Sequence, residues 1–65
     1  MRLFEVNENE FINPQLVVAC RVCQVENWYV ARFQFEDKYK LDLLYKKKQE
    51  AVSRINEFVV FCASL

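Results

Sequence analysis

The stretch that most constrains the fold runs from Leu16 to Glu36 and alternates apolar and polar residues on both sides of a turn signal. Its two β-prone runs, Leu16 to Val25 and Trp28 to Glu36, are separated by Glu26-Asn27. Two residues are the commonest length of a tight hairpin loop, and Asn27 tolerates the positive φ that a type I′ turn requires. The stretch therefore predicts a long antiparallel hairpin.

A two-residue loop also predicts the register of this hairpin. The pairs next to the turn are Val25 with Trp28, Cys23 with Val30, and Arg21 with Arg32. One face then carries the apolar side chains Val18, Cys20, Val22, Tyr29, Ala31, Phe33 and Phe35. A slip by one residue would expose this whole set to water, so the pattern specifies the register and marks the core face.

Three further segments surround the hairpin. The alternation of Tyr39 to Tyr45 predicts a third long strand, joined by the loop Glu36-Asp37-Lys38. Arg2 to Val6 predicts a short strand at a sheet edge. Asn7 to Gln15 is polar and holds the one proline, so we expect a loop. In this loop Phe11 and Ile12 are expected to fold back as a plug on the sheet.

From about Lys47 the apolar period becomes helical. The apolar positions fall on one stripe, made of Ala51, Val52, Ile55, Phe58, Val59 and Cys62. We expect a helix over 47–62 on the core face, with a Glu50–Arg54 pair on its outer side. A helix that ends near Glu57, followed by a strand at 58–62, is the alternative, because FVVFC is β-prone.

The elements together predict one α+β domain over residues 1–65. It is a small antiparallel β-sheet of three long strands plus a short N-terminal edge strand, with one C-terminal α-helix packed on one face. A chain of 65 residues buries only about 60% of the surface that it exposes when unfolded. Some of its abundant apolar surface is therefore expected to stay outside the core.

Composition limits the classes of function. The formal net charge is zero, although residues 1–37 have six acidic and three basic side chains and residues 38–65 have three and six. Three cysteines do not make a disulfide framework, and we expect a cytoplasmic protein. No secretory signal or run of about 18 apolar residues is found, so we expect no membrane association.

Catalytic and metal-binding patterns are sparse. The chain has no histidine, which is the usual general base near neutral pH. Cys20 and Cys23 form a C-x-x-C pattern, but residues three apart in a strand point to opposite faces. Cys62 would add only a third ligand. We therefore expect small buried hydrophobes here, with no metal, no cofactor, no small-molecule substrate and no enzymatic activity.

The face of the hairpin that points away from the helix is the candidate site. Its predicted partner-binding residues are Trp28, Val30, Arg21, Arg32 and Leu44. Apolar and aromatic side chains beside an arginine are typical of protein interfaces. We therefore expect a small non-catalytic protein-interaction module, a regulator or inhibitor of a larger protein that also self-associates as a homodimer.

The arginines of this face have two interpretations. Arg21 opposite Arg32 is a like-charge pair, which is destabilising unless an anion lies near. The register places Asp42 beside Arg32, so the row is either a surface Arg–Asp ladder or a site for an anion.

Nucleic-acid binding is the alternative function. Lys46, Lys47 and Lys48 open a helix that has no capping side chain, where a phosphate would be favourable. Over residues 28–58 the order of antiparallel strands and then a helix that begins K-x-x-E-A-V resembles the layout of small sheet-reading DNA-binding domains, in which three strands precede the helix. In this alternative Arg21 and Arg32 would act with the three lysines on nucleic acid.

Overall fold

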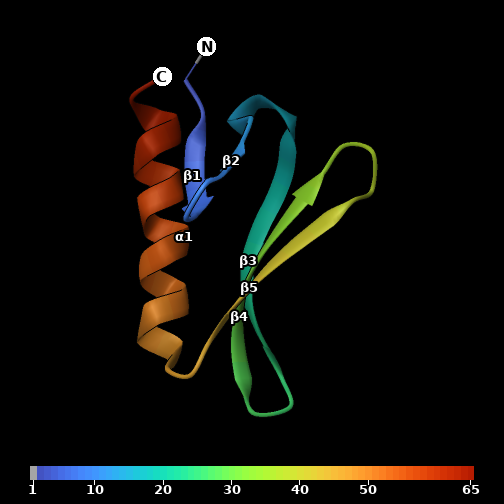
Figure 1. Cartoon of the computed structure of the whole chain (residues 1–65), viewed down its shortest axis with the longest axis vertical. Helices are drawn as coiled ribbons and strands as arrows, with labels where there is room; N and C mark the ends of the chain where they lie inside the picture. Colours follow the sequence, from blue (N-terminus) through green and yellow to red (C-terminus); the bar gives the residue numbers. More distant parts are fainter. Residues whose placement is uncertain (1) are drawn as a thin grey trace.

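Residues 2–65, which the computed structural model describes, form two antiparallel sheets and one helix. The elements in order are β1 (Phe4–Asn7), β2 (Glu10–Ile12), a 3-10 turn (Pro14–Leu16), β3 (Val17–Val25), β4 (Trp28–Phe35), β5 (Lys40–Tyr45) and α1 (Lys48–Ala63). The larger sheet has the order β3-β4-β5, and β1 and β2 form a sheet of their own. Helix α1 lies along one side of the larger sheet, with the β1-β2 hairpin beside it (Figure 1). The predicted α+β architecture is confirmed.

The predicted register of the long hairpin is confirmed from the turn to Ala19. Val25 pairs with Trp28, Cys23 with Val30, and Arg21 with Arg32. The loop before β5 also has the predicted length, because the Phe35 amide donates to the Tyr39 carbonyl over 2.8 Å. β5 continues the predicted pairs, with Leu41 opposite Phe33 and Asp42 opposite Arg32.

A bulge at the start of β3 changes the prediction for Val18. Val17 pairs with Phe35 and Ala19 with Gln34, so Val18 is an extra residue on its strand. A bulge breaks the alternation of side chains. Val17 therefore packs against the core, whereas Val18 is 60% exposed. The prediction that Val18 belongs to the core face is wrong for this reason.

The turn at Glu26-Asn27 has the predicted length but not the predicted type. Glu26 has a φ of 55°, and Asn27 is not among the residues with positive φ. A positive φ at the first central residue alone is the pattern of a type II′ turn, which favours glycine there. Glu26 thus has a conformation that is unfavourable for a residue with a Cβ atom.

The N-terminal segment differs most from the prediction. β1 does not extend the edge of the main sheet but pairs with β2 as a separate hairpin. Asn9 closes its turn with a φ of 64°, which asparagine tolerates, and the Asn7 side chain donates to Glu10 over 2.8 Å. The strand prediction for Phe4 to Val6 is confirmed, but the predicted loop over 7–15 contains a strand.

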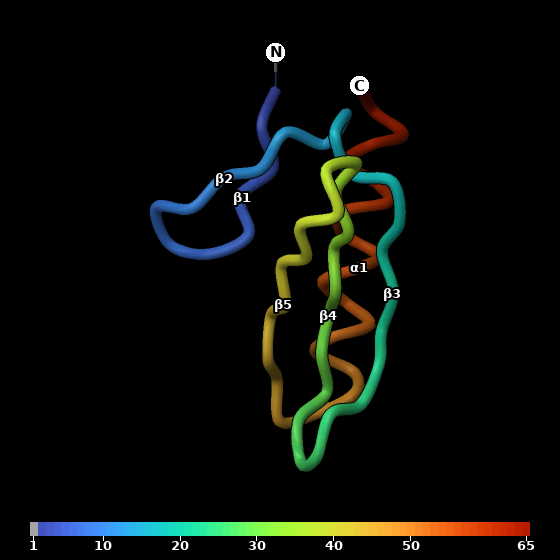
Figure 2. The backbone as a smooth tube through the Cα atoms, turned by 90° about the vertical axis from the view of Figure 1, so that its right-hand side faces the viewer, coloured from blue at the N-terminus to red at the C-terminus, as the bar shows by residue number. Residues whose placement is uncertain are grey.

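The hairpin packs on the helix side of the main sheet. Phe4, Val6 and Ile12 are buried in the same core cluster as Phe33 and Phe58. Phe11 is 54% exposed and forms no plug, because it alternates with Ile12 along β2. As Figure 2 shows for residues 2–65, α1 passes behind the sheet and the hairpin lies beyond the β5 edge. The opposite face of the sheet is left open.

Helix α1 is continuous to Ala63, so a strand at 58–62 does not form. Ala51, Ile55, Phe58 and Cys62 pack in or against the core, as the stripe predicts. Val52 and Val59 do not, since they are 37% and 53% exposed. Their place is taken by Phe61 on the other flank of the helix, where its ring lies 5.3 Å from that of Phe4. The hairpin, which the pattern did not predict, draws this flank into the core.

The turn gives a test of the fold with a control one residue away. We expect Glu26→Gly to raise the free energy of unfolding by about 0.5–1 kcal/mol, because glycine has no steric penalty at positive φ. Asn27→Gly is expected to lower it by a similar amount, because glycine there only adds flexibility to the unfolded chain. Urea unfolding measures both changes. Stabilisation by Asn27→Gly and not by Glu26→Gly would contradict the assigned turn.

Candidate functional site

The candidate site is the uncovered face of the main sheet, which we call the open face. Its side chains are the outward residues of β3, β4 and β5: Ala19, Arg21, Cys23, Val25, Trp28, Val30, Arg32, Gln34, Lys40, Asp42 and Leu44. Within residues 2–65, α1 packs on the other face, and the β1-β2 hairpin lies beyond the β5 edge with its buried side chains in the same core (Figure 2). The open face therefore remains in contact with solvent.

An apolar cluster occupies the end of the open face near the β3-β4 turn. Val30 is at its centre, between its cross-strand partners Cys23 and Leu44, and is only 1% exposed. Around it Val25, Trp28 and Leu44 are 44%, 37% and 54% exposed. Val30 was predicted as a contact residue, but its position makes it the floor of the cluster. The surrounding side chains form the accessible surface.

Trp28 has a cationic neighbour that the sequence pattern did not reveal. The Lys46 ammonium lies over the indole ring, 5.4 Å from its centroid. Lys46 follows directly after β5, whose last residue Tyr45 pairs with Tyr29. This register brings Lys46 level with Trp28 on the neighbouring strand. A cation over an exposed indole stabilises by roughly 0.5–1 kcal/mol and places a positive charge on the cluster.

The two arginines of the open face, Arg21 and Arg32, find hydrogen-bond partners within the sheet. Arg32 donates from Nε and Nη2 to the two carboxylate oxygens of Asp42, over 2.8 and 2.9 Å. This hydrogen bonding lowers the pKa of Asp42 below its ordinary value. Arg21 donates to the Gln34 side chain over 3.4 Å. The surface Arg–Asp ladder is the interpretation that this geometry supports, and Arg21 is the arginine whose charge has no carboxylate among these contacts.

The three lysines at the start of α1 spread over different surfaces. Lys47 is the N-cap residue, and its side chain makes no capping hydrogen bond. Lys46 lies over Trp28, whereas Lys48 borders a hollow next to Tyr29 and Gln24. The predicted uncapped helix end is confirmed. Its lysines are not gathered on one site.

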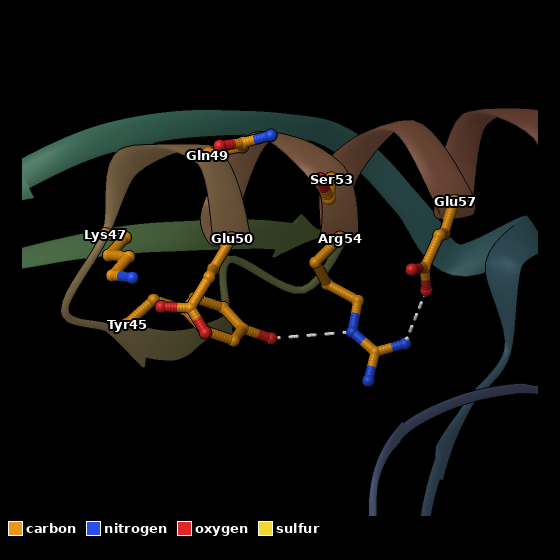
Figure 3. A pocket seen from close by; sticks show the side chains of 7 residues that line it. All are labelled: Tyr45, Lys47, Gln49, Glu50, Ser53, Arg54 and Glu57. Carbon is orange, nitrogen blue, oxygen red and sulfur yellow. Dashed lines mark hydrogen bonds and ion pairs between the residues drawn. The ribbon is translucent and has the colours of Figure 1, made fainter.

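A second hollow, of about 600 Å³, lies between the end of β5 and the first turns of α1, apart from the hollow beside Lys48 (Figure 3). Its lining is polar, and is made of Tyr45, Lys47, Gln49, Glu50, Ser53, Arg54 and Glu57. Arg54 donates to the Tyr45 hydroxyl over 3.4 Å and to Glu57 over 3.0 Å. The i,i+3 pair with Glu57 takes the place of the predicted pair with Glu50.

Arg54 also holds the N-terminal hairpin. It donates to the Val6 carbonyl over 3.5 Å, and its guanidinium lies 5.7 Å from the centroid of the Phe4 ring. One side chain of α1 thereby contacts β1 and β5 together. The guanidinium of Arg54 therefore has a structural role in this hollow. The chain has no histidine that could activate Ser53.

Cys20 and Cys23 point to opposite faces, as their spacing predicts. Cys20 packs against the core with Cys62, and its burial raises the pKa of its thiol above the ordinary value. Cys23 lies on the open face beside Val30. In the described part of the chain, residues 2–65, no three side chains of the metal-binding types gather into one site.

Comparison with protein-family models, with curated protein sequences and with solved structures finds no match to this chain. In the range 2–65, α1 is neither long nor apolar enough to cross a membrane.

The contacts of Arg54 predict a large effect for a residue on the helix surface. We expect Arg54→Met to lower the free energy of unfolding by about 1–2 kcal/mol, because the Val6 carbonyl and the Tyr45 hydroxyl lose their charged donor. Glu57→Gln is the matched control and should cost less than about 0.5 kcal/mol, since it removes only an exposed pair. Urea unfolding and amide exchange of β1 and β2 measure the change. Equal effects of the two substitutions would contradict this role.

Proposed function

We propose that the chain is a small non-catalytic protein-interaction module that binds a protein partner through its open face and also self-associates. One observation carries the proposal. Val25, Trp28 and Leu44 form a contiguous exposed cluster on a face that the other described residues, within 2–65, leave uncovered. Exposed aromatic and aliphatic side chains that surround a buried floor are typical of interface centres.

The charges around the cluster support a protein partner over nucleic acid. Arg32 already donates hydrogen bonds to both carboxylate oxygens of Asp42, so a phosphate would have to displace Asp42. The centre of the face is apolar rather than basic. Arg21 and Lys46 border the cluster and suit an acidic rim on the partner.

A regulator or inhibitor of a larger protein is the biological role that we infer for such a module. The exposed apolar cluster on the open face is small, and binding through one surface needs no catalytic group. A cytoplasmic location stays a prediction from the cysteine content.

The proposal predicts that one side chain controls partner binding. With the protein immobilised and exposed to extract from its own source, we expect Trp28→Ala to abolish specific capture, because it removes the aromatic anchor of the cluster. Val60→Ser is the matched control. Val60 is 68% exposed on α1, and its replacement should leave capture unchanged. If both variants lost capture equally, or if neither lost it, the open face would not be the binding surface.

Salt dependence separates this function from the alternative. We expect capture to change only a few-fold between 50 and 200 mM salt, because apolar contacts dominate. Binding of mixed oligonucleotides by Arg21 and the three lysines would fall by roughly a hundredfold over the same range, as four phosphate contacts require. A mobility shift of that kind, with no protein captured, would favour the nucleic-acid function.

A further inference from the structure

We propose that a second copy of this chain is one partner of the open face, and that the copies associate head to tail. The Trp28 end of one copy would enter a groove at the opposite end of the next. The inference rests on the proposed function, because Trp28 belongs to the open face. It adds the identity of the partner and the site on that partner.

The groove lies where β2, the 3-10 turn and the β4-β5 loop meet. It has a volume of about 370 Å³, near the lower end for ligand pockets. Phe11, Leu16 and Tyr39 line it, and they are 54%, 42% and 58% exposed. The Tyr39 ring lies 5.7 Å from that of Phe35, so the groove has an aromatic wall. An indole side chain can be accommodated in such a space.

The charges of the groove all have one sign. Glu10, Glu36 and Asp37 line it, and each of the other lining residues is uncharged. All three acidic residues are exposed. The groove therefore combines apolar walls with a negative rim, and it suits an apolar side chain that has cations beside it.

The Trp28 end of the molecule has the complementary properties. Trp28 and Val25 are exposed there, with Lys46 over the indole and Lys47 next along the chain. The one carboxylate of the adjoining turn is Glu26. This end therefore presents an aromatic anchor with an excess of positive charge.

The two surfaces cannot meet within one copy. β4 begins at Trp28 and ends at Phe35, beside the groove, and its eight residues span about 23 Å. In Figure 1 the β3-β4 turn and the β4-β5 turn lie at opposite ends of the molecule. Contact between the surfaces thus requires two copies.

The same charges disfavour a two-fold symmetric contact at either end. Two Trp28 ends face to face would bring lysines against lysines, and two grooves would bring carboxylates against carboxylates. Like charges across an interface cost free energy and select against that pairing. The end-to-groove contact avoids both, and as a heterologous contact it continues from copy to copy unless a ring closes.

The test uses one variant for each surface. Phe11→Ser/Glu36→Lys changes the groove, and Trp28→Ser/Lys46→Glu changes the lysine end. Each is expected to raise the dissociation constant for self-association at least about tenfold in sedimentation velocity, as the loss of an anchor requires. An equal mixture should form a heterodimer that stops at two copies, because each partner keeps one working surface.

Circular dichroism of each variant establishes that it is folded. If a double variant does not fold, the single charge reversals Glu36→Lys and Lys46→Glu replace the pair in the same mixing experiment. Wild-type protein that stays monomeric at high concentration would overturn the inference, as would variants that fail to recover association when mixed. Binding of another protein through the open face would survive this result if Trp28→Ala still abolished its capture, whereas self-association would not. The two failures are therefore distinguishable.

Discussion

The ring of Phe58 connects the three layers of this small protein, and the arrangement of its surfaces follows from that contact. Its centroid lies 5.1 Å from that of Phe4 in β1 and 5.0 Å from that of Phe33 in β4, both in edge-to-face geometry. Ala51 lies two helical turns before Phe58 and is fully buried, and its small side chain lets α1 approach the sheet closely. Because Phe4 of the hairpin and Phe33 of the sheet pack on the same ring, helix and hairpin share one core on the same side of the sheet. Within residues 2–65 no further element covers the other face of the sheet.

The parts of the fold that depend on periodicity could be predicted from the sequence. Alternation specified the pairing of β3, β4 and β5, and the helical stripe specified α1. The bulge at Val18 could not be predicted, because Val17 and Val18 are chemically the same and only the packing decides which faces inward. The β1-β2 hairpin was missed because its turn contains no glycine. The asparagine at position 9 was the available signal, because asparagine tolerates the left-handed conformation, but this signal is weak.

The candidate site shows the same division. Trp28 and Leu44 are exposed on the open face, as the register predicts, and Asp42 lies beside Arg32. Alternation assigns a side chain to a face but does not determine its exposure. Val30 is covered by its neighbours on both adjacent strands, and Lys46 reaches Trp28 from beyond the end of β5. The acidic groove combines residues that are far apart in the sequence, so no local pattern indicated it.

The open face is uncovered in the isolated molecule. The fluorescence of Trp28 tests this claim most directly. Trp28 is the one tryptophan of the chain, so its emission needs no assignment. Because Trp28 is 37% exposed, we expect emission in dilute native protein between that of buried and that of solvated indole, together with quenching by acrylamide. Iodide should quench more effectively than caesium because Lys46 attracts anions. Blue-shifted emission that resists acrylamide until urea unfolds the protein would mean that the face is covered, and would contradict the claim.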